Sequence, residues 1–359
     1  MSYAWPVSRH FGNPAMASYR SLKTRYPRGR LEPGQAGWIA DHLLALRAAL
    51  RAQITDRRRP NSLIVGSWNI RHFDGGRKRL DESYHYIAEI IDHFDICAIQ
   101  EVKDLSAMER LVGLLGPAWD YFVNDSSGGG RGNHERMAFV YNRNRVRFRN
   151  LIGELVLPKG VLPGDEQIGR TPFFASFQAG WFRFTMCSAH IVFEEQEGRP
   201  LREDEIRVIA SILAQRAKEA DEVHIFLGDM NIDSRTDPGF FALTDHGFIV
   251  PEIGATSLSG IRHYDQIAFA GPQDVTHLLG HGVVRWQDVV YREDQAAAYE
   301  AIARAIREKP DTGKPYSNWS RSYSDWRTHE MSDHLPIWIE IEVDYSDDYL
   351  RGISALKDD

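Results

Sequence analysis

Acidic, amide and imidazole side chains directly follow several apolar segments of this sequence. They are Asn69 in SWNIR, Glu101 in IQEVKD, His190 in CSAHI, Asp229 and Asn231 in LGDMNID, Asp265 in HYDQI, and Asp333 with His334 in MSDHLP. A buried charge beside an apolar strand is costly unless a metal ion or a partner meets it. One such residue is typical of a turn or a helix cap. The repetition along one chain instead indicates a shared site at the strand ends of an α/β sheet.

The residue types favour phosphoester hydrolysis. Carboxylate and amide oxygens without a Cys/His cluster are ligands for Mg²⁺ or Mn²⁺ rather than for structural zinc. Such a cation binds a phosphoryl oxygen and stabilises the charge that develops in an in-line displacement. Histidines near carboxylates serve as general acid and general base. The sequence therefore predicts a phosphoester hydrolase with Mg²⁺ as cofactor and Mn²⁺ as an alternative.

Strands and helices must alternate to bring these residues to one edge. Apolar runs such as SLIVGSW, DICAIQ, FRFTMCSAHI, VHIFLGD and LPIWIEIEV predict strands, and apolar residues at helical spacing predict helices between them. Some strands follow one another as hairpins. We therefore expect an α/β sandwich with helices outside stacked sheets.

The organisation of the chain follows from the same patterns. Residues 1–61 read as an N-terminal extension with an amphipathic helix over 37–57, residues 62–343 as the domain that carries the motifs, and residues 344–359 as a C-terminal tail. Residues 286–330 interrupt the strand pattern and are rich in Tyr, Trp, Ser and Arg. We interpret them as an insertion that either covers the site or packs as a surface excursion.

The composition is that of a globular chain with a modest acidic excess. Of 359 residues, 43 are Lys or Arg and 50 are Asp or Glu, which gives a net charge of −7. A nucleic-acid partner usually shows as a basic excess, so this charge argues against tight gripping of long DNA. The two cysteines lie in apolar segments, which predicts buried thiols in a reducing compartment. With neither a membrane span nor a signal-like start in the pattern, we expect a cytoplasmic protein.

The motifs together resemble the endonuclease/exonuclease/phosphatase superfamily, and most closely its deoxyribonuclease I-like branch. The matching motifs are WNIR (68–71), QEVKD (100–104), ERMAFVYNRNRV (135–146), the AH of CSAHI, GDMNID (228–233), ATS…YDQI (255–267) and SDHLPI (332–337). The resemblance covers roughly residues 62–343. It implies a four-layered α/β sandwich, in which two mixed or antiparallel sheets are flanked by helices and the site lies at the sheet edge.

The resemblance also implies a role for each site residue. The implied metal ligands are Glu101, Asn69, Asp229 and Asp333; the implied catalytic groups are His190 with Glu135, His334 with Asp265, and Asp229 with Asn231; the implied substrate-binding residues are Asn69, Asn231, Arg71 and Lys103. Each carboxylate would fix the tautomer of its histidine and raise its basicity. Which histidine is the acid and which is the base stays open at this point.

The family pattern specifies phosphoester chemistry better than it specifies the substrate, because nucleases, lipid and inositol phosphatases and sphingomyelinases share the fold. A nuclease that acts on DNA or RNA is the leading interpretation, since the YDQI text is nearest to the deoxyribonuclease I form. A phosphatase or phosphodiesterase acting on a lipid headgroup or a small metabolite is the alternative. An inactive binding protein with the same fold is a second alternative, disfavoured because every expected acid and histidine is present.

Overall fold

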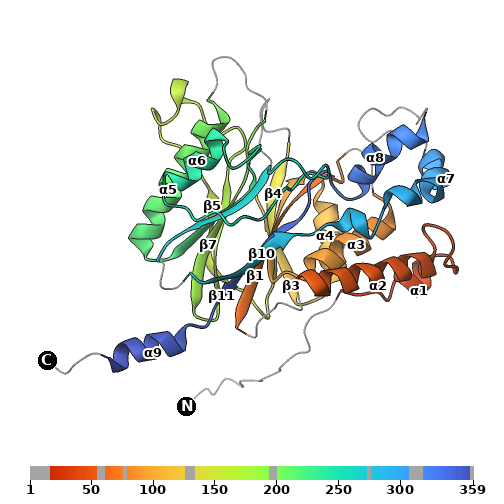
Figure 1. Cartoon of the computed structure of the whole chain (residues 1–359), viewed down its shortest axis with the longest axis horizontal. Helices are drawn as coiled ribbons and strands as arrows, with labels where there is room; N and C mark the ends of the chain where they lie inside the picture. The colour runs from red at the N-terminus through yellow and green to blue at the C-terminus, as the bar shows by residue number, and fades with distance from the viewer. Residues whose placement is uncertain are drawn as a thin grey trace, which may run out of the picture.

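Two β-sheets packed face to face form the centre of the protein, with helices on both outer surfaces (Figure 1). The structure is a computed structural model, and it describes residues 17–54, 61–75, 79–125, 134–193, 200–272, 276–306 and 318–355. The first sheet has the strand order β10-β11-β1-β2-β4-β3, and the second has the order β5-β6-β7-β8-β9. Both sheets are mixed, because β1 runs parallel to β2 and β7 runs parallel to β8 while their other neighbours are antiparallel.

The strand bounds are as follows. The six-stranded sheet contains β1 (Ser62–Phe73), β2 (Ile96–Val102), β3 (Trp119–Val123), β4 (Arg136–Asn142), β10 (Leu278–Val283) and β11 (Ile337–Glu342). The five-stranded sheet contains β5 (Arg147–Glu154), β6 (Phe173–Ala179), β7 (Phe182–His190), β8 (Val223–Asp229) and β9 (Asp265–Ala270).

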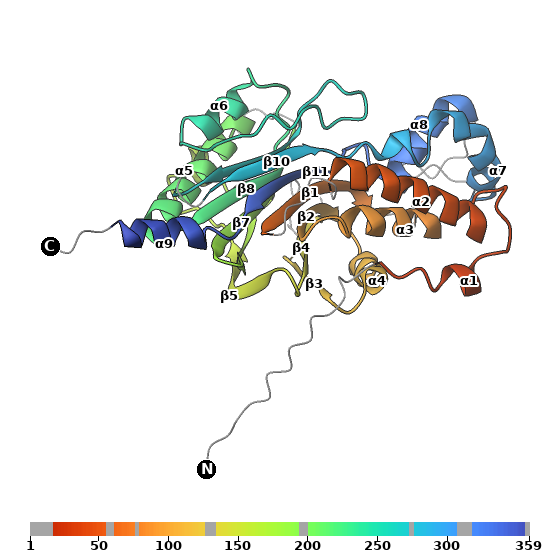
Figure 2. The same ribbon diagram turned by 60° about the horizontal axis from the view of Figure 1, so that its bottom comes forward.

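The helices form the two outer layers (Figure 2). On the side of the first sheet lie α1 (Leu22–Arg25), α2 (Ala36–Gln53), α3 (Asp81–Ile91), α4 (Leu105–Leu115), α7 (Ala296–Ile306) and α8 (Trp319–Glu330); on the side of the second lie α5 (Arg202–Ala220) and α6 (Pro238–Thr244). Helix α9 (Ser346–Ser354) extends from the body near the C-terminus. The predicted α/β class and the sandwich of two helix-flanked sheets are therefore confirmed. None of the described helices has the length and apolar character of a membrane span.

Alternate positions of the central strands fill two different cores. Leu63 and Val65 of β1 pack between the two sheets, whereas Ile64 and Trp68 pack against the helices. Successive strand residues point to opposite faces, and here both faces are covered. This is why the central strands read as continuous apolar runs in the sequence.

Helices α2, α7 and α8 pack on the outer side of the first sheet, in the same core cluster as α3. Apolar residues of α2 are buried in the same cluster as α3, and Trp326 of α8 is fully buried there as well. The helix predicted over 37–57 is present as α2, which begins one residue earlier and ends at Gln53. Residues 55–60, and residues 307–317 of the interpreted insertion, lie outside the described residues.

The strand register brings the polar residues to one edge of the sandwich. In the second sheet His190 pairs with Asp229, and Asp229 pairs with Asp265, so these residues form a row across adjacent strands. In the first sheet Asn69 pairs with Gln100, which places Glu101 directly beyond it. Strand order and register thus assemble residues that are distant in sequence.

Candidate active site

Unusual backbone conformations shape the strand ends of the site. Glu101 has φ 63° and Asn231 has φ 52°, both in the left-handed region that residues other than glycine seldom adopt. Such conformations persist where surrounding contacts hold them, and they cluster at functional sites. Gly228, just before Asp229, has φ 128°, and a Cβ built there would lie 2.0 Å from the carbonyl oxygen of Ala189. The motif therefore requires glycine for the close approach of β8 to β7.

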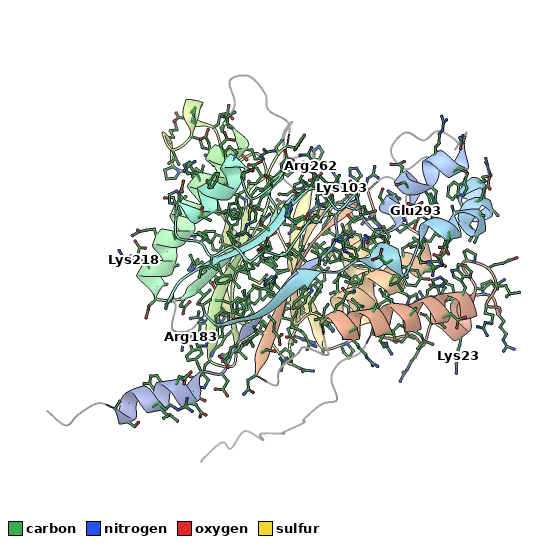
Figure 3. The ribbon with its side chains drawn as sticks, in the orientation of Figure 1. Lys23, Lys103, Arg183, Lys218, Arg262 and Glu293 are labelled. Carbon is green, nitrogen blue, oxygen red and sulfur yellow. The ribbon has the colours of Figure 1, made fainter. Side chains whose placement is uncertain are left out.

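The first acid–imidazole pair joins His190 to Glu135. His190 Nδ1 lies 3.0 Å from Glu135 Oε2, and both side chains are buried. Two cations share the same carboxylate: Lys103 Nζ lies 3.2 Å from Oε1, and Arg170 Nε lies 3.0 Å from Oε2 (Lys103 is labelled in Figure 3). Burial raises the pKa of Glu135, but the hydrogen bond and charge of His190, followed by the two cations, outweigh burial and hold it at about 2. Glu135 therefore stays ionised and fixes the ring of His190.

The second pair joins His334 to Asp265. The distance between His334 Nδ1 and Asp265 Oδ2 is 2.8 Å, and Asp265 is 1% exposed. Burial lowers the pKa of His334, but the charges of Asp265 and Asp229 outweigh it and raise the pKa well above its ordinary value. Burial raises the pKa of Asp265. Both shifts keep a proton within this pair.

Asp229 lies between the two histidines. Its Oδ2 atom is 3.5 Å from His190 Nε2 and 3.6 Å from His334 Nε2, and it accepts a hydrogen bond of 2.9 Å from Asn69 Nδ2. The backbone amide of Asn231 donates to the other oxygen at 3.0 Å. Burial raises the pKa of Asp229, but His334 and then His190 outweigh it, so the net shift is downward. The centre of the site is thus an ionised carboxylate faced by two imidazoles.

The oxygen atoms around Asn69 fit a divalent cation. The same Asn69 amide nitrogen that reaches Asp229 also donates to Glu101 Oε1 at 3.1 Å. Asn69 Oδ1 is buried and accepts no hydrogen bond within the described part of the chain. Ligand atoms of His72, Glu101 and Glu135 lie within 4.8 Å of one another, as do those of Asp229, Asp265 and His334. The carboxylate oxygens of these groups, and the buried amide oxygen of Asn69, are ligand types that suit Mg²⁺, Mn²⁺ or Ca²⁺.

The structure gathers most of the predicted site residues at this edge. Those brought together are Asn69, Glu101, Lys103, Glu135, His190, Asp229, Asn231, Asp265 and His334. Asp333 is exposed and belongs to neither of the two groups of ligand atoms. Arg71 is turned toward α8, where its Nη1 meets Asp325 Oδ1 at 3.1 Å and Thr328 Oγ1 at 2.5 Å.

Two residues at the site, Arg170 and Ser332, were not predicted as site residues. Arg170 comes from the loop before β6, and no periodicity or strand end marks it. Ser332 is buried and donates a hydrogen bond to the carbonyl oxygen of Asn69 at 2.6 Å. Its position two residues before His334, in the SDH motif, is the one feature of the sequence that indicated it.

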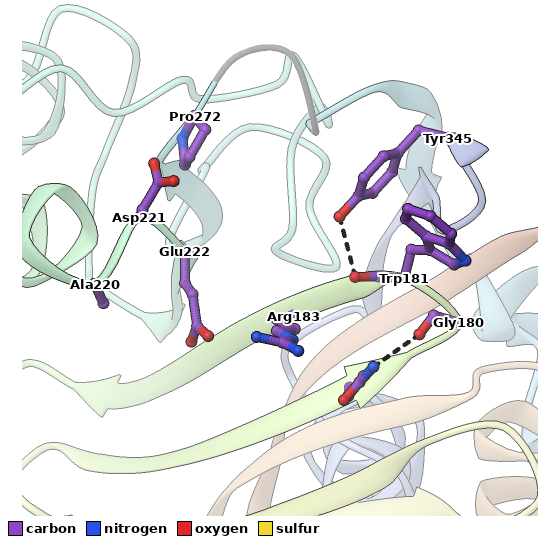
Figure 4. A pocket seen from close by; sticks show the side chains of 9 residues that line it. Gly180, Trp181, Arg183, Ala220, Asp221, Glu222, Pro272 and Tyr345 are labelled. Carbon is purple, nitrogen blue, oxygen red and sulfur yellow. Dashed lines mark hydrogen bonds between the residues drawn. The ribbon is translucent and has the colours of Figure 1, made fainter. Parts of the chain in front are cut away.

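A separate cavity lies at the other end of β7. It has a volume of about 610 Å³ and is lined by residues that include Trp181, Arg183, Glu222 and Tyr345 (Figure 4). The turn through Trp181 begins β7, whereas His190 ends the strand. The cavity is therefore distinct from the acid–imidazole pairs.

The sandwich fold and the two acid–imidazole pairs are typical of a class of hydrolytic enzyme. Comparison with known proteins supports the same class. The profile of the Endonuclease/Exonuclease/phosphatase family matches residues 66–331, and the chain belongs to this family. It is a phosphoester hydrolase of a family that depends on a divalent metal.

Individual relatives and solved structures are similar to the chain over most of its length. Deoxyribonuclease-1 of Equus caballus is 29% identical over 322 residues, which cover 83% of this chain and 96% of the relative. Deoxyribonuclease gamma of Rattus norvegicus is 25% identical over 287 residues, covering 73% and 89% respectively. A mannosyl-6-phosphatase of Bacteroides thetaiotaomicron has the same fold, with a TM-score of 0.51 at 17% identity over 78% of this chain and 99% of that one.

Proposed function

We propose that the chain is a Mg²⁺-dependent nuclease that hydrolyses phosphodiester bonds of DNA or RNA. The observation that carries this proposal is the pair of acid-held histidines whose Nε2 atoms face one oxygen of Asp229, at 3.5 and 3.6 Å. Two imidazoles arranged in this way suit the activation of water on one side of a phosphate and protonation of the leaving oxygen on the other. Similarity to two deoxyribonucleases over most of the chain favours a polynucleotide as the substrate.

The carboxylates decide what each histidine can do. Because Nδ1 of each ring lies against a carboxylate, a neutral ring has its lone pair at Nε2 and accepts a proton there. A protonated ring donates from the same atom. The pairs His190–Glu135 and His334–Asp265 can therefore supply the base and the acid of one reaction.

The remaining site residues hold the substrate and the metal in this proposal. Glu101, Asn69 and Asp229 would hold Mg²⁺, with Asp333 as a further ligand at the exposed rim. When bound, Mg²⁺ supplies charge that stabilises the phosphoryl oxygens. The substrate-binding residues are Asn69, Asn231, Arg71 and Lys103. A cytoplasmic location belongs to the same proposal, supported by the buried free thiols of Cys97 and Cys187.

A substrate panel tests the proposal. The purified chain is incubated with plasmid DNA, single-stranded DNA and RNA, inositol and sugar phosphates, and a lipid phosphodiester, each with Mg²⁺, Mn²⁺, Ca²⁺ or EDTA. We expect metal-dependent cleavage of a polynucleotide with kcat/KM at least about tenfold above that for any small ester. Preferential hydrolysis of a lipid or sugar phosphate would overturn the choice of substrate. Hydrolysis of none of these esters would favour a binding protein.

A matched pair of variants ties the activity to the site. His190→Ala removes an imidazole of the site, whereas His277→Ala removes one that pairs with Glu342 at 2.8 Å on a partly exposed surface. We expect the first variant to lose hydrolysis and the second to retain it. Equal activity of both variants would place the reaction elsewhere.

A further inference from the structure

Two aromatic rings form a ledge beside the acid–imidazole pairs. Phe193 lies in the segment that follows His190, and 54% of its surface is exposed. Tyr264 directly precedes Asp265, and its ring lies against His334 with a centroid distance of 5.7 Å and an interplanar angle of 39°. The two rings meet edge to face, 6.4 Å apart at 78°. The ring of Tyr264 thus lies against one histidine of the site, and Phe193 lies against Tyr264.

A cationic side chain lies over one ring of the aromatic ledge of Phe193 and Tyr264. The guanidinium of Arg202 lies over the ring of Phe193 at 5.7 Å. Arg262, two residues before Tyr264 in the sequence and labelled in Figure 3, is about half exposed and pairs with Asp233 at 2.9 Å. An exposed phenylalanine alone is ordinary on a protein surface. Beside a phosphodiesterase site, and next to arginine, it matches the interleaving of aromatic and basic groups in proteins that bind single strands.

We propose that the aromatic ledge stacks on an unpaired nucleobase of the substrate, next to the phosphate that is cut. This inference rests on the proposed nuclease function and narrows its substrate to single-stranded or locally unpaired DNA or RNA. A base within a duplex has both faces covered by its neighbours, whereas an unpaired base offers a free face to an aromatic ring. Stacking also needs no basic excess, so it agrees with the net charge of −7.

The first test measures cleavage at one defined bond. The substrate is a single strand with one hydrolysable phosphodiester, in which both nucleotides at that bond carry either a base or an abasic tetrahydrofuran unit. Phe193→Ala should lower kcat/KM about tenfold on the strand with bases, within the range measured for stacking by alanine substitution. The same variant should match the wild type on the abasic strand. Phe193→Leu, which keeps apolar bulk without a π-face, should recover only part of the loss.

The inference is overturned by an equal loss on both strands, since that would indicate a merely structural role for Phe193. It is also overturned by unchanged cleavage of the strand with bases, or by faster cleavage of a duplex than of a single strand.

A binding measurement separates the ledge from the nuclease reaction. The His190→Ala variant is titrated with a single strand that contains 2-aminopurine, whose fluorescence reports stacking, with Ca²⁺ present. We expect quenching on binding, and its loss when Phe193→Ala is added. Binding without Phe193-dependent quenching, or no binding, overturns the ledge. A third outcome is quenching that depends on Phe193 in a protein whose wild type hydrolyses no polynucleotide. That outcome would overturn the nuclease function but support stacking on the aromatic ledge.

Discussion

Replacing Asp265 by asparagine changes the charge of one acid while nearly keeping its shape. Asp265 Oδ2 lies 2.8 Å from His334 Nδ1, and Asp229 Oδ2 lies 3.6 Å from Nε2. At an effective dielectric constant of about 20, unit charges at these distances attract by roughly 6 and 5 kcal/mol. Asp265 therefore supplies about half of the attraction that offsets the burial of a charged His334. Without it, burial should bring the pKa of His334 down sharply, and kcat/KM at neutral pH should fall by about 10²-fold or more.

The assay is kcat/KM of Asp265→Asn across the pH range, with urea unfolding in EDTA as a second readout. The pKa of His334 in the folded protein is raised above its value in the unfolded chain. The pair should therefore stabilise the wild type fully below about pH 6.5, and lose that stabilisation as the pH rises through the folded pKa. Asp265→Asn should flatten this part of the stability curve.

The control for this variant is Glu342→Gln. Glu342 pairs with His277 at the same distance of 2.8 Å, but both side chains are more than a third exposed. Solvent screens such a pair, so we expect little change in activity or stability. An Asp265→Asn enzyme within about threefold of wild-type kcat/KM, with an unchanged pH profile, would refute the reasoning.

Further predictions concern metal binding, substrate binding and the stability of the buried core. EDTA should abolish hydrolysis, and Glu101→Gln should weaken metal binding at least about tenfold, measured as the Mg²⁺ concentration needed to raise Tm. Arg71→Ala should lower by about 1 the slope of the logarithm of the binding constant against the logarithm of the salt concentration, if Arg71 contacts a phosphate of the substrate. The slope should not change if Arg71 contacts only α8. Burial raises the pKa of Glu82 to about 7, so the wild type should lose roughly 3 kcal/mol of stability between about pH 4.5 and 7, and Glu82→Gln should abolish that dependence in urea titrations. Trp326→Ala, at a fully buried ring, should cost about 3–5 kcal/mol in the same titrations.

The fold and the core of the site were readable in the sequence for a physical reason. Central strands covered on both faces need continuous apolar runs, and the polar residues that end those runs are out of place unless they meet in a site. Asp229 and His190 are examples, because each ends such a strand and the parallel register sets them side by side.

Contacts made by tertiary packing were not readable in this way. Arg170 reaches Glu135 from a loop with no period of its own. Arg71 pairs with Asp325, which lies 254 positions later in the sequence, and the residues around Arg71 in WNIR give no indication of this partner. The aromatic residues of the insertion were equally ambiguous, since Trp326 in a polar segment suits an exposed stack as well as a core. Its complete burial among rings such as Tyr299 is decided by α2, α3 and α7, which are distant in the chain.

The end of α8 links residues 286–330 to the proposed active site. Glu330 is fully buried and accepts hydrogen bonds from Ser83 Oγ at 2.8 Å and from the backbone amide of Leu80 at 2.7 Å, which fixes α8 to the start of α3. Two residues later, Ser332 Oγ donates to the carbonyl of Asn69 and accepts from the backbone amide of His334 at 3.1 Å. A shift of α8 would therefore displace the proposed metal-binding strand and the second imidazole together.

This linkage allows substitutions at the junction after α8 to be distinguished from substitutions within α8. Ser332→Ala removes a hydroxyl at the junction and should impair hydrolysis with a modest change in stability, because the Asn69 carbonyl and the His334 amide lose their hydrogen bonds to that hydroxyl. Trp326→Ala should instead lower stability first, and hydrolysis only as α8 loosens. A Ser332→Ala enzyme with unaltered kcat/KM would show that Asn69 and His334 hold their positions without the hydrogen bonds of Ser332.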